Sequence, residues 1–192
     1  MQDERRRQLI EATLTTVHRH GLAETTTQRI ARQAGLSPGI IHHYCAGKDA
    51  LLAATMRQLL KELRDDVAKR LAAAANPEAR VRAVLDANFA PAQFRPAVVA
   101  AWLAFWAQSP YDPELERLRR LYTRRTHSNL TAPLKALLPP AEARATAITL
   151  AAMIDGFWLR AGQHDTDLDH EDARAQALAH LALVLGEARR RP

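Results

Sequence analysis

Apolar side chains recur along this chain at the three-to-four-residue spacing of an amphipathic α-helix. The first such stretch covers about residues 3–20, with Ile10, Leu14 and Val17 on one face and Gly21 as its expected end. A longer stretch runs from about residue 48 to 74, and its stripe is Leu52, Met56, Leu59, Leu63, Val67 and Leu71. Runs of β-branched residues are scarce, so the pattern predicts an all-α fold.

Prolines divide the rest of the chain, because proline is accepted in the first turn of a helix and disrupts its interior. Pro77 and Pro113 are expected to begin helices, and Pro133 is expected to kink or split one. The further helices are expected at about 77–89, 96–108, 113–121, 141–162 and 169–186. With two short helices between residues 25 and 48, the total is about nine.

Two short helices and a tight turn are predicted between Thr25 and Lys48. Thr27 is the expected N-cap of the first helix, and Gly35 is placed where that helix must stop. Ser37 is suited to cap the second helix, with Pro38 in its first turn. Two helices of this length around a glycine turn predict a helix-turn-helix, which places its second helix in the major groove of DNA.

The charge of the same segment favours a nucleic-acid partner. Its charged residues are Arg29, Arg32 and Lys48, and none is acidic. The whole chain carries a formal net charge of +6. Because phosphate binding needs a basic surface, motif and charge together predict binding to double-stranded DNA.

The segment also resembles the DNA-binding domain of the TetR family of transcriptional regulators, through the run G-L-A-E-T-T-T-Q-R-I-A-R-Q-A-G-L-S-P-G-I-I-H-H-Y-C-A-G-K-D-A-L-L. The resemblance implies a helix-turn-helix domain over residues 1–47 and a helical ligand-binding and dimerisation domain over 48–192. Cys45 departs from the family pattern, which usually has Phe there, and a smaller side chain is expected to loosen the seat of the recognition helix.

The resemblance implies a set of DNA contacts. Tyr44 and Lys48 match positions that contact phosphate, Gly39 would let the backbone approach the DNA, and Gln28 could pair with a base edge. The full expected set is Thr26, Thr27, Gln28, Ser37, Pro38, Gly39, Ile40, His42, His43, Tyr44 and Lys48.

The body of the chain concentrates its few aromatic residues. Trp102, Phe105 and Trp106 are spaced i, i+3 and i+4, and Trp158 follows Asp155 on another apolar helix. Such a stripe is also typical of ordinary core packing. A carboxylate on an apolar helix, however, needs a partner. The candidates are an internal cation, Arg160 or His127, or a cationic ligand enclosed by tryptophan faces and by Phe89.

Four segments resemble TetR-type repressors that control choline-to-glycine-betaine synthesis: R-R-R-Q-L-I-E-A-T-L, S-P-G-I-I-H-H-Y, A-W-L-A-F-W-A and A-A-M-I-D-G-F-W-L-R-A. The resemblance implies choline or a related quaternary ammonium as effector, bound by Phe89, Trp102, Phe105, Trp106, Asp155 and Trp158. A multidrug-sensing repressor of an efflux pump and a nonspecific DNA-binding protein are the alternatives.

Other chemistry finds little support in the sequence. No nucleophile elbow, phosphate-binding glycine loop or HExxH motif is present, so no enzyme and no cofactor are expected. His42 and His43 are adjacent and point to different helix faces, which makes them poor joint ligands of a metal. The acidic run from His164 starts with calcium-loop spacing, but His170 and Gln176 stand where that loop needs glycine and glutamate.

Two further expectations concern assembly and compartment. The last two helices are expected to form a homodimer through Ala147, Ile148, Ala151, Ala152, Ile154, Leu178, Leu181, Ala182 and Leu185. A single cysteine, no apolar run of roughly 18 residues and no signal-peptide pattern indicate a cytoplasmic protein.

Overall fold

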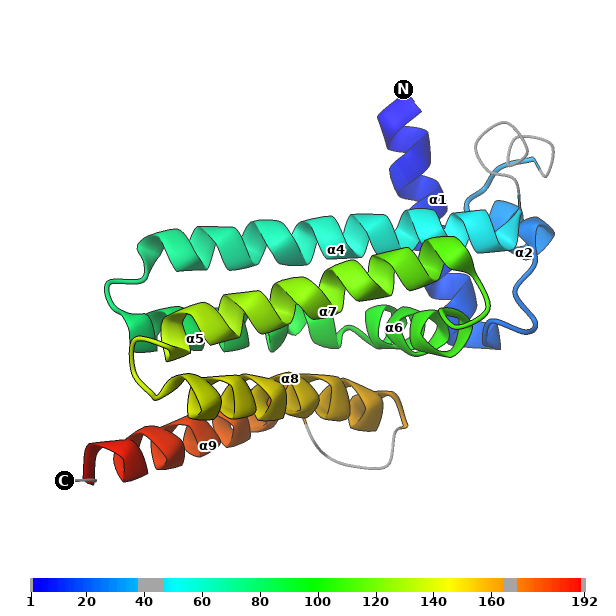
Figure 1. The fold of residues 1–192 in the computed structure, drawn as a ribbon. Helices are drawn as coiled ribbons and strands as arrows, with labels where there is room; N and C mark the ends of the chain where they lie inside the picture. Colours follow the sequence, from blue (N-terminus) through cyan, green and yellow to red (C-terminus); the bar gives the residue numbers. More distant parts are fainter. Residues whose placement is uncertain (1, 38–46, 164–168, 191–192) are drawn as a thin grey trace. The chain divides into compact units, whose positions relative to one another are not determined.

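The structure is a computed structural model that describes residues 2–37, 47–163 and 169–190. These ranges contain no strand, which agrees with the all-α prediction. The described elements are α1 (Gln2–His20), α2 (Thr27–Gln33), α4 (Lys48–Ala73), α5 (Pro77–Asn88), the 3-10 helix η1 (Pro91–Phe94), α6 (Pro96–Gln108), α7 (Pro113–Leu134), α8 (Pro140–Gly162) and α9 (His170–Arg190) (Figure 1).

Local signals set most helix starts. Asn76 accepts a hydrogen bond from the Ala79 amide at 2.8 Å, and Pro77 follows it as the first residue of α5. Asp169 accepts from the amides of Glu171 and Asp172 at 2.7 and 2.9 Å, so it caps α9. Gly21, just after α1, has a φ of 69°, which glycine adopts at little cost.

Two helix ends differ from the prediction. Helix α7 continues past Leu121 to Leu134, and Pro133 lies in its last turn, where it ends the helix and does not split it. Helix α9 continues past Gly186 to Arg190. An interior glycine costs only about 1 kcal/mol in a helix, which the burial of Leu181 and Leu185 on the same helix can offset.

The chain divides into two compact units. The first contains Met1–Lys61 and Arg95–Arg119, and the second contains Glu62–Phe94 and Arg120–Pro192. Helix α4 therefore begins in the first unit and ends in the second. The division into a DNA-binding part over 1–47 and a ligand-binding part over 48–192 is a functional expectation and stays a prediction.

In the first unit, both α2 and α6 pack against α1. The small core of this unit joins α1, α2 and the start of α4 through Leu9, Ala12, Ile30, Ala31 and Leu51. Helix α6 packs along α1, and the Arg95 guanidinium donates to the Glu11 carboxylate at 3.0 Å. The aromatic helix α6 is thus in direct contact with α1.

In the second unit, α8 and α5 both pack against α9. Small residues allow the close approach of α8 and α9, since Ala143, Ala147, Ala173 and Ala177 are fully buried. Arg174 of α9 also pairs with Asp86 of α5 at 2.6 Å. Because such exposed ion pairs contribute little, packing is the main stabilising term here.

Part of the predicted dimer surface on α8 and α9 is wrong, because several of its residues pack inside the subunit. Ala147, Ala151, Ile154, Leu181 and Leu185 are buried inside the subunit. Ile148, Ala152 and Ala182 are exposed as expected, and they are joined on the same helices by Leu159 and Leu183. The expectation mixed the inner and outer faces because both are built from small and aliphatic residues.

Among the described residues, no helix is long and apolar enough to cross a membrane.

Candidate DNA-binding and ligand-binding sites

The turn of the helix-turn-helix is closed by a Schellman motif. The Leu36 amide donates to the Ala31 carbonyl at 2.9 Å, and the Gly35 amide donates to the Arg32 carbonyl at 3.1 Å. Gly35 has a φ of 66°, the left-handed conformation that this motif requires. The sequence prediction for Gly35 is therefore confirmed.

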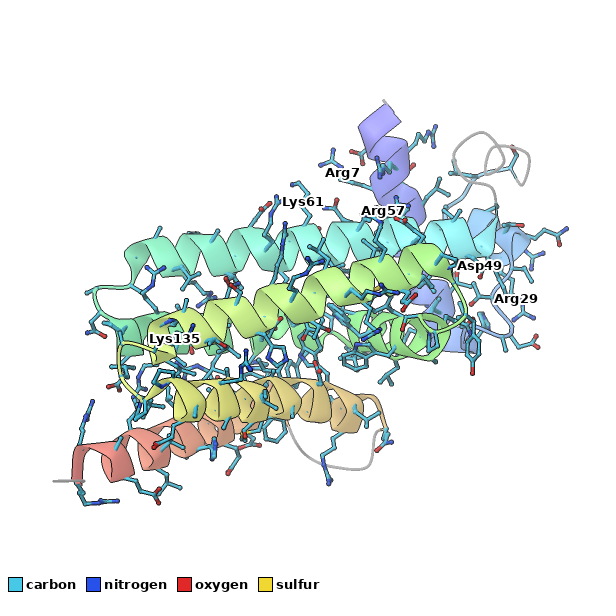
Figure 2. All side chains as sticks on the ribbon, in the orientation of Figure 1. Arg7, Arg29, Asp49, Arg57, Lys61 and Lys135 are labelled. Carbon is cyan, nitrogen blue, oxygen red and sulfur yellow. The ribbon has the colours of Figure 1, made fainter. Side chains whose placement is uncertain are left out.

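The N-cap of α2 is Thr26, not Thr27. Thr26 has extended backbone angles, and its hydroxyl accepts a hydrogen bond from the Arg29 amide at 3.2 Å. Thr27 and Gln28 occupy the first turn, where backbone amides lack partners within the helix and the dipole favours an anion. The guanidinium of Arg29, a residue labelled in Figure 2, lies 3.6 Å from the carboxylate of Glu24.

Lys48 stands at the start of α4. Its ammonium group donates to the Leu22 carbonyl at 3.4 Å, which ties the start of α4 to the loop before α2. The group has three donors, so it can hold this carbonyl and also reach a phosphate. Ser37 is exposed. The remaining expected DNA contacts, Pro38, Gly39, Ile40, His42, His43 and Tyr44, lie outside the described residues, as do Cys45 and the acidic run 164–168.

The aromatic stripe of α6 forms a compact cluster in the first unit. The ring centroid of Trp102 lies 5.7 Å from that of Phe105 and 5.7 Å from that of Trp106. Trp102 and Phe105 are fully buried, and Trp106 is half-buried. This is the geometry of favourable aromatic packing, which agrees with the core-packing alternative.

A second aromatic cluster, in the second unit, joins α5, α7 and α8. Trp158 stacks on Tyr122 with a centroid distance of 6.1 Å, and its indole N–H donates to the Asn88 carbonyl at 3.2 Å. Phe89 packs edge-on against Phe157 at 5.8 Å. Trp158 and Phe89 are almost completely buried.

This second cluster contains the carboxylate of Asp155. The Tyr122 hydroxyl donates to Asp155 Oδ1 at 2.9 Å. Burial raises the pKa of Asp155, while the Tyr122 hydrogen bond and the nearby His127 lower it. Burial together with the negative charge of Asp155 raises the pKa of Tyr122, so the phenol stays protonated. Asp155 is therefore a partly desolvated acid whose ionised form a bound cation would stabilise.

The neighbouring groove has the opposite electrostatic character. A groove of about 540 Å³ between α7 and α8 is lined by His127, Ser128, Thr131, Ala132, Lys135, Arg144 and Ile148. Lys135 is labelled in Figure 2. With Lys135 and Arg144 in its wall and no carboxylate, this groove is unsuited to a quaternary ammonium ion.

The structure divides the expected ligand residues between the two units. Phe89, Asp155 and Trp158 belong to the second, while Trp102, Phe105 and Trp106 belong to the first. Of the two partners expected for Asp155, His127 acts on it electrostatically, whereas Arg160 is exposed. Sequence reasoning missed Tyr122, the hydrogen-bond partner. Its one signal was the apolar spacing of Leu115, Leu118 and Tyr122 on α7, which places a phenol on a buried face.

Comparison with known proteins decides the family. The sequence pattern of the bacterial regulatory proteins of the tetR family matches residues 9–55, which contain α2 and its turn. The pattern of the C-terminal domain of BetI-type transcriptional repressors matches residues 77–186. The chain belongs to the TetR family.

Curated relatives of this TetR-family chain carry the BetI name. It is 47% identical to the HTH-type transcriptional regulator BetI 1 of Chromohalobacter salexigens over 178 residues, 92% of this chain and 88% of the relative. It is 45% identical to BetI of Burkholderia thailandensis over 186 residues, 96% of this chain and 95% of that one. These relatives identify a TetR-type transcriptional repressor, a regulator and not an enzyme.

Solved structures share the fold. A TetR transcription regulator from Haloarcula marismortui matches with a TM-score of 0.80 at 28% identity, covering 93% of this chain and 96% of that one. A transcriptional regulator from Saccharomonospora viridis, solved in complex with choline, matches with a TM-score of 0.80 and the coverages 93% and 96%. Its identity to this chain is 19%, so the second match shows a common fold alone.

Proposed function

We propose that this TetR-family protein represses genes of glycine betaine synthesis and that choline, or a closely related quaternary ammonium, modulates its binding to operator DNA. The observation that carries the proposal is the half-buried Asp155 carboxylate beside the Tyr122–Trp158 pair. Relatives named BetI, 45–48% identical over at least 90% of this chain, support the same physiological role.

DNA binding is assigned to the helix-turn-helix and the start of α4. The free amides at the start of α2 and the ammonium of Lys48 supply phosphate contacts that orient the protein on the duplex. Within the set expected from the sequence, Tyr44 is a further phosphate contact, and Gln28, exposed at the start of α2, is the candidate for a base contact. The domain boundary proposed for this function lies between residues 47 and 48.

A homodimer is proposed through the outer faces of α8 and α9. Ile148, Leu159 and Leu183 are 51%, 45% and 63% exposed in the single subunit, which is unusual for such apolar side chains. The exposed small residues Ala152 on α8 and Ala182 on α9 permit close contact between helices of the two subunits. A two-fold dimer would present two recognition helices to successive major grooves, about 34–36 Å apart.

The quaternary ammonium site is proposed at Asp155, Trp158 and Phe89 in the second unit. Such a cation has no N–H donor, so it is held by a counter-charge and by aromatic faces. Asp155 supplies the charge, and Trp158 and Phe89 supply the rings. Each favourable ring contact with the cation would contribute about 0.5–2 kcal/mol. Trp102, Phe105 and Trp106, which the sequence also predicts as ligand residues, belong to the first unit and stay a sequence prediction.

Helix α4 is the proposed link between the two functions. It begins at Lys48 beside the DNA-binding segment and continues without interruption to Ala73, in the unit that contains Asp155. A ligand alters DNA binding only if it prefers one of two arrangements of this helix, because equal affinity for both shifts nothing. A coupling of roughly 1–3 kcal/mol would reduce operator occupancy without abolishing it.

The test of the effector combines two titrations of the full-length protein. Choline affinity is measured calorimetrically, and the affinity for a DNA fragment from upstream of betaine-synthesis genes is measured with and without choline. We expect saturable choline binding and weaker DNA binding in its presence. Choline binding that leaves DNA affinity unchanged would contradict the switch, and bulky lipophilic cations that bind as tightly as choline would favour the multidrug alternative.

DNA docking is tested separately with Lys48→Gln. The loss of one phosphate contact should weaken binding to all DNA sequences and lower the slope of log affinity against log salt by about one. Lys69→Gln is the matched control, since Lys69 is an exposed lysine near the other end of the same helix. If both variants keep the wild-type slope, the proposed docking of α4 is wrong.

A further inference from the structure

The groove between α7 and α8 lies outside the proposed cation site and has a basic wall. Its volume is about 540 Å³, and His127, Lys135 and Arg144 are among its lining residues, none of which is acidic. All of them belong to the second unit. Small-molecule sites have volumes of roughly 300–1,000 Å³. The groove is therefore large enough for a small organic ligand, and its charge decides which kind.

Two permanent cations of the groove flank the turn between the helices. Lys135 follows the last residue of α7 directly, and Arg144 lies in the second turn of α8. The short turn that joins the two helices is visible in Figure 1, and Lys135 is labelled beside it in Figure 2. Because both residues are a few positions from the same turn and line the same groove, they form one basic end of it.

No acid neutralises this basic end. Elsewhere in the second unit, exposed arginines have carboxylate partners: Arg82 pairs with Glu78 at 2.9 Å, and Arg174 pairs with Asp86 at 2.6 Å. Within the part of the chain that the structure describes, neither Lys135 nor Arg144 has such a partner. A hollow lined by charges of one sign concentrates counter-ions.

The remaining walls supply hydrogen-bond donors and an apolar contact. Ser128 and Thr131 are one turn apart on α7, and their hydroxyls can donate to an oxyanion. His127 precedes Lys135 by about two turns, or roughly 12 Å along the axis. Ile148 of α8 adds an aliphatic surface. The groove thus fits an elongated molecule with an anionic group at one end and carbon atoms behind it.

We propose that this groove binds a small organic oxyanion whose carboxylate or phosphate group lies between Lys135 and Arg144. A guanidinium fork matches the paired oxygens of either group, and the ammonium adds a point charge. The site is separate from the one proposed at Asp155, so the protein would take two ligands of opposite charge. His127 borders both, since it lines the groove and also acts electrostatically on Asp155.

The test titrates the full-length protein with sodium succinate and with sodium phosphate, in a buffer without other multivalent anions. Sodium chloride at the same ionic strength is the reference. We expect at least one oxyanion to bind saturably in calorimetry and to raise the midpoint of thermal unfolding, as a ligand specific to the folded state does. The tighter of the two identifies the bound group as carboxylate or phosphate. Equal effects of all three salts would overturn the proposal.

A pair of double variants locates the site. Lys135→Gln with Arg144→Gln should weaken oxyanion binding about tenfold or more, because both charge-assisted contacts are lost. Arg124→Gln with Arg160→Gln is the matched control, since it removes the same charge from exposed positions of α7 and α8 outside the groove. Equal weakening in both variants would mean attraction by net charge alone and would contradict a site in the groove.

Self-association and choline binding distinguish the remaining outcomes. Ile148 also belongs to the proposed dimer surface, so acidic side chains of a second copy are the rival occupant of the groove. If the Lys135 and Arg144 variant weakens the dimer in sedimentation and leaves oxyanion affinity unchanged, the small-anion assignment is wrong. Choline affinity should stay within about twofold of wild type in the control variant. Failure of oxyanion binding with choline binding intact would overturn this inference and leave the proposed function standing.

Discussion

The two tryptophan clusters of this TetR-family protein use the same kind of ring but differ in the polar atoms beside the rings. On α6, Trp102, Phe105 and Trp106 pack on one another, in a unit where α6 lies along α1. In the other unit, Trp158 donates to the main-chain carbonyl of Asn88 and stacks on Tyr122, whose hydroxyl is bonded to the Asp155 carboxylate. Aromatic content alone therefore does not separate the two clusters, whereas the partly desolvated charge beside Tyr122 does.

The largest expected effect is on stability, and it belongs to the α6 cluster. Trp102→Ala should lower the free energy of unfolding by about 3–5 kcal/mol, because Trp102 is fully buried and truncation leaves a cavity. Urea unfolding of the full-length protein measures the loss. A change below about 1 kcal/mol would show that α6 is not a packing element and would erase the contrast between the clusters.

Asp155→Asn should affect ligand binding most. Loss of the counter-charge is expected to weaken choline binding by about tenfold or more. Asn can still accept from Tyr122, so the local hydrogen bond is kept. Burial raises the pKa of Asp155, so its ionised form opposes folding at neutral pH, and this penalty disappears as pH falls through the folded pKa.

The same variant should therefore be at least as stable as the wild type at pH 7 in thermal unfolding. Weaker choline binding with equal or greater stability is the signature of a functional carboxylate. Unchanged choline affinity in Asp155→Asn would show that the charge recognises nothing, and the second cluster would then be ordinary core as well.

Trp106→Ala tests whether the α6 cluster contributes to ligand binding as well as to packing. If Trp106 is a ligand residue, as the sequence predicts, removal of this half-buried ring should weaken choline binding by about two- to tenfold. Calorimetry measures the effect, with Tyr111→Ala as the control because Tyr111 is 83% exposed near the end of the same helix. Wild-type affinity in Trp106→Ala would confine the site to Asp155 and its neighbours.

The smallest effect is expected from Tyr122→Phe, and it concerns pH. The Tyr122 hydroxyl lowers the pKa of Asp155, so its removal should raise that pKa further. Choline binding requires the ionised acid and weakens as pH falls towards the Asp155 pKa, which lies above 3.8. The midpoint of this loss should move to higher pH, while the affinity at pH 8 changes by less than about threefold. An identical pH profile would mean that Tyr122 does not tune the carboxylate.

Sequence by itself determined the features that depend on neighbours along the chain. The prolines at 77, 96 and 113 start helices as expected, Gly35 makes the turn, and the motif around it identifies the family. The N-cap was misplaced by one residue, at Thr27 in place of Thr26, because adjacent threonines have the same capping chemistry and only the backbone angles choose between them.

Only the tertiary structure decided which distant side chains meet. The need of Asp155 for a partner was evident from its apolar helix, but its partner, Tyr122, lies 33 residues away on another helix. The inner and outer faces of α8 and α9 were likewise separated only by packing, because alanine and leucine serve both. Helical periodicity is a local property, whereas hydrogen-bond pairing and burial depend on how the helices are assembled.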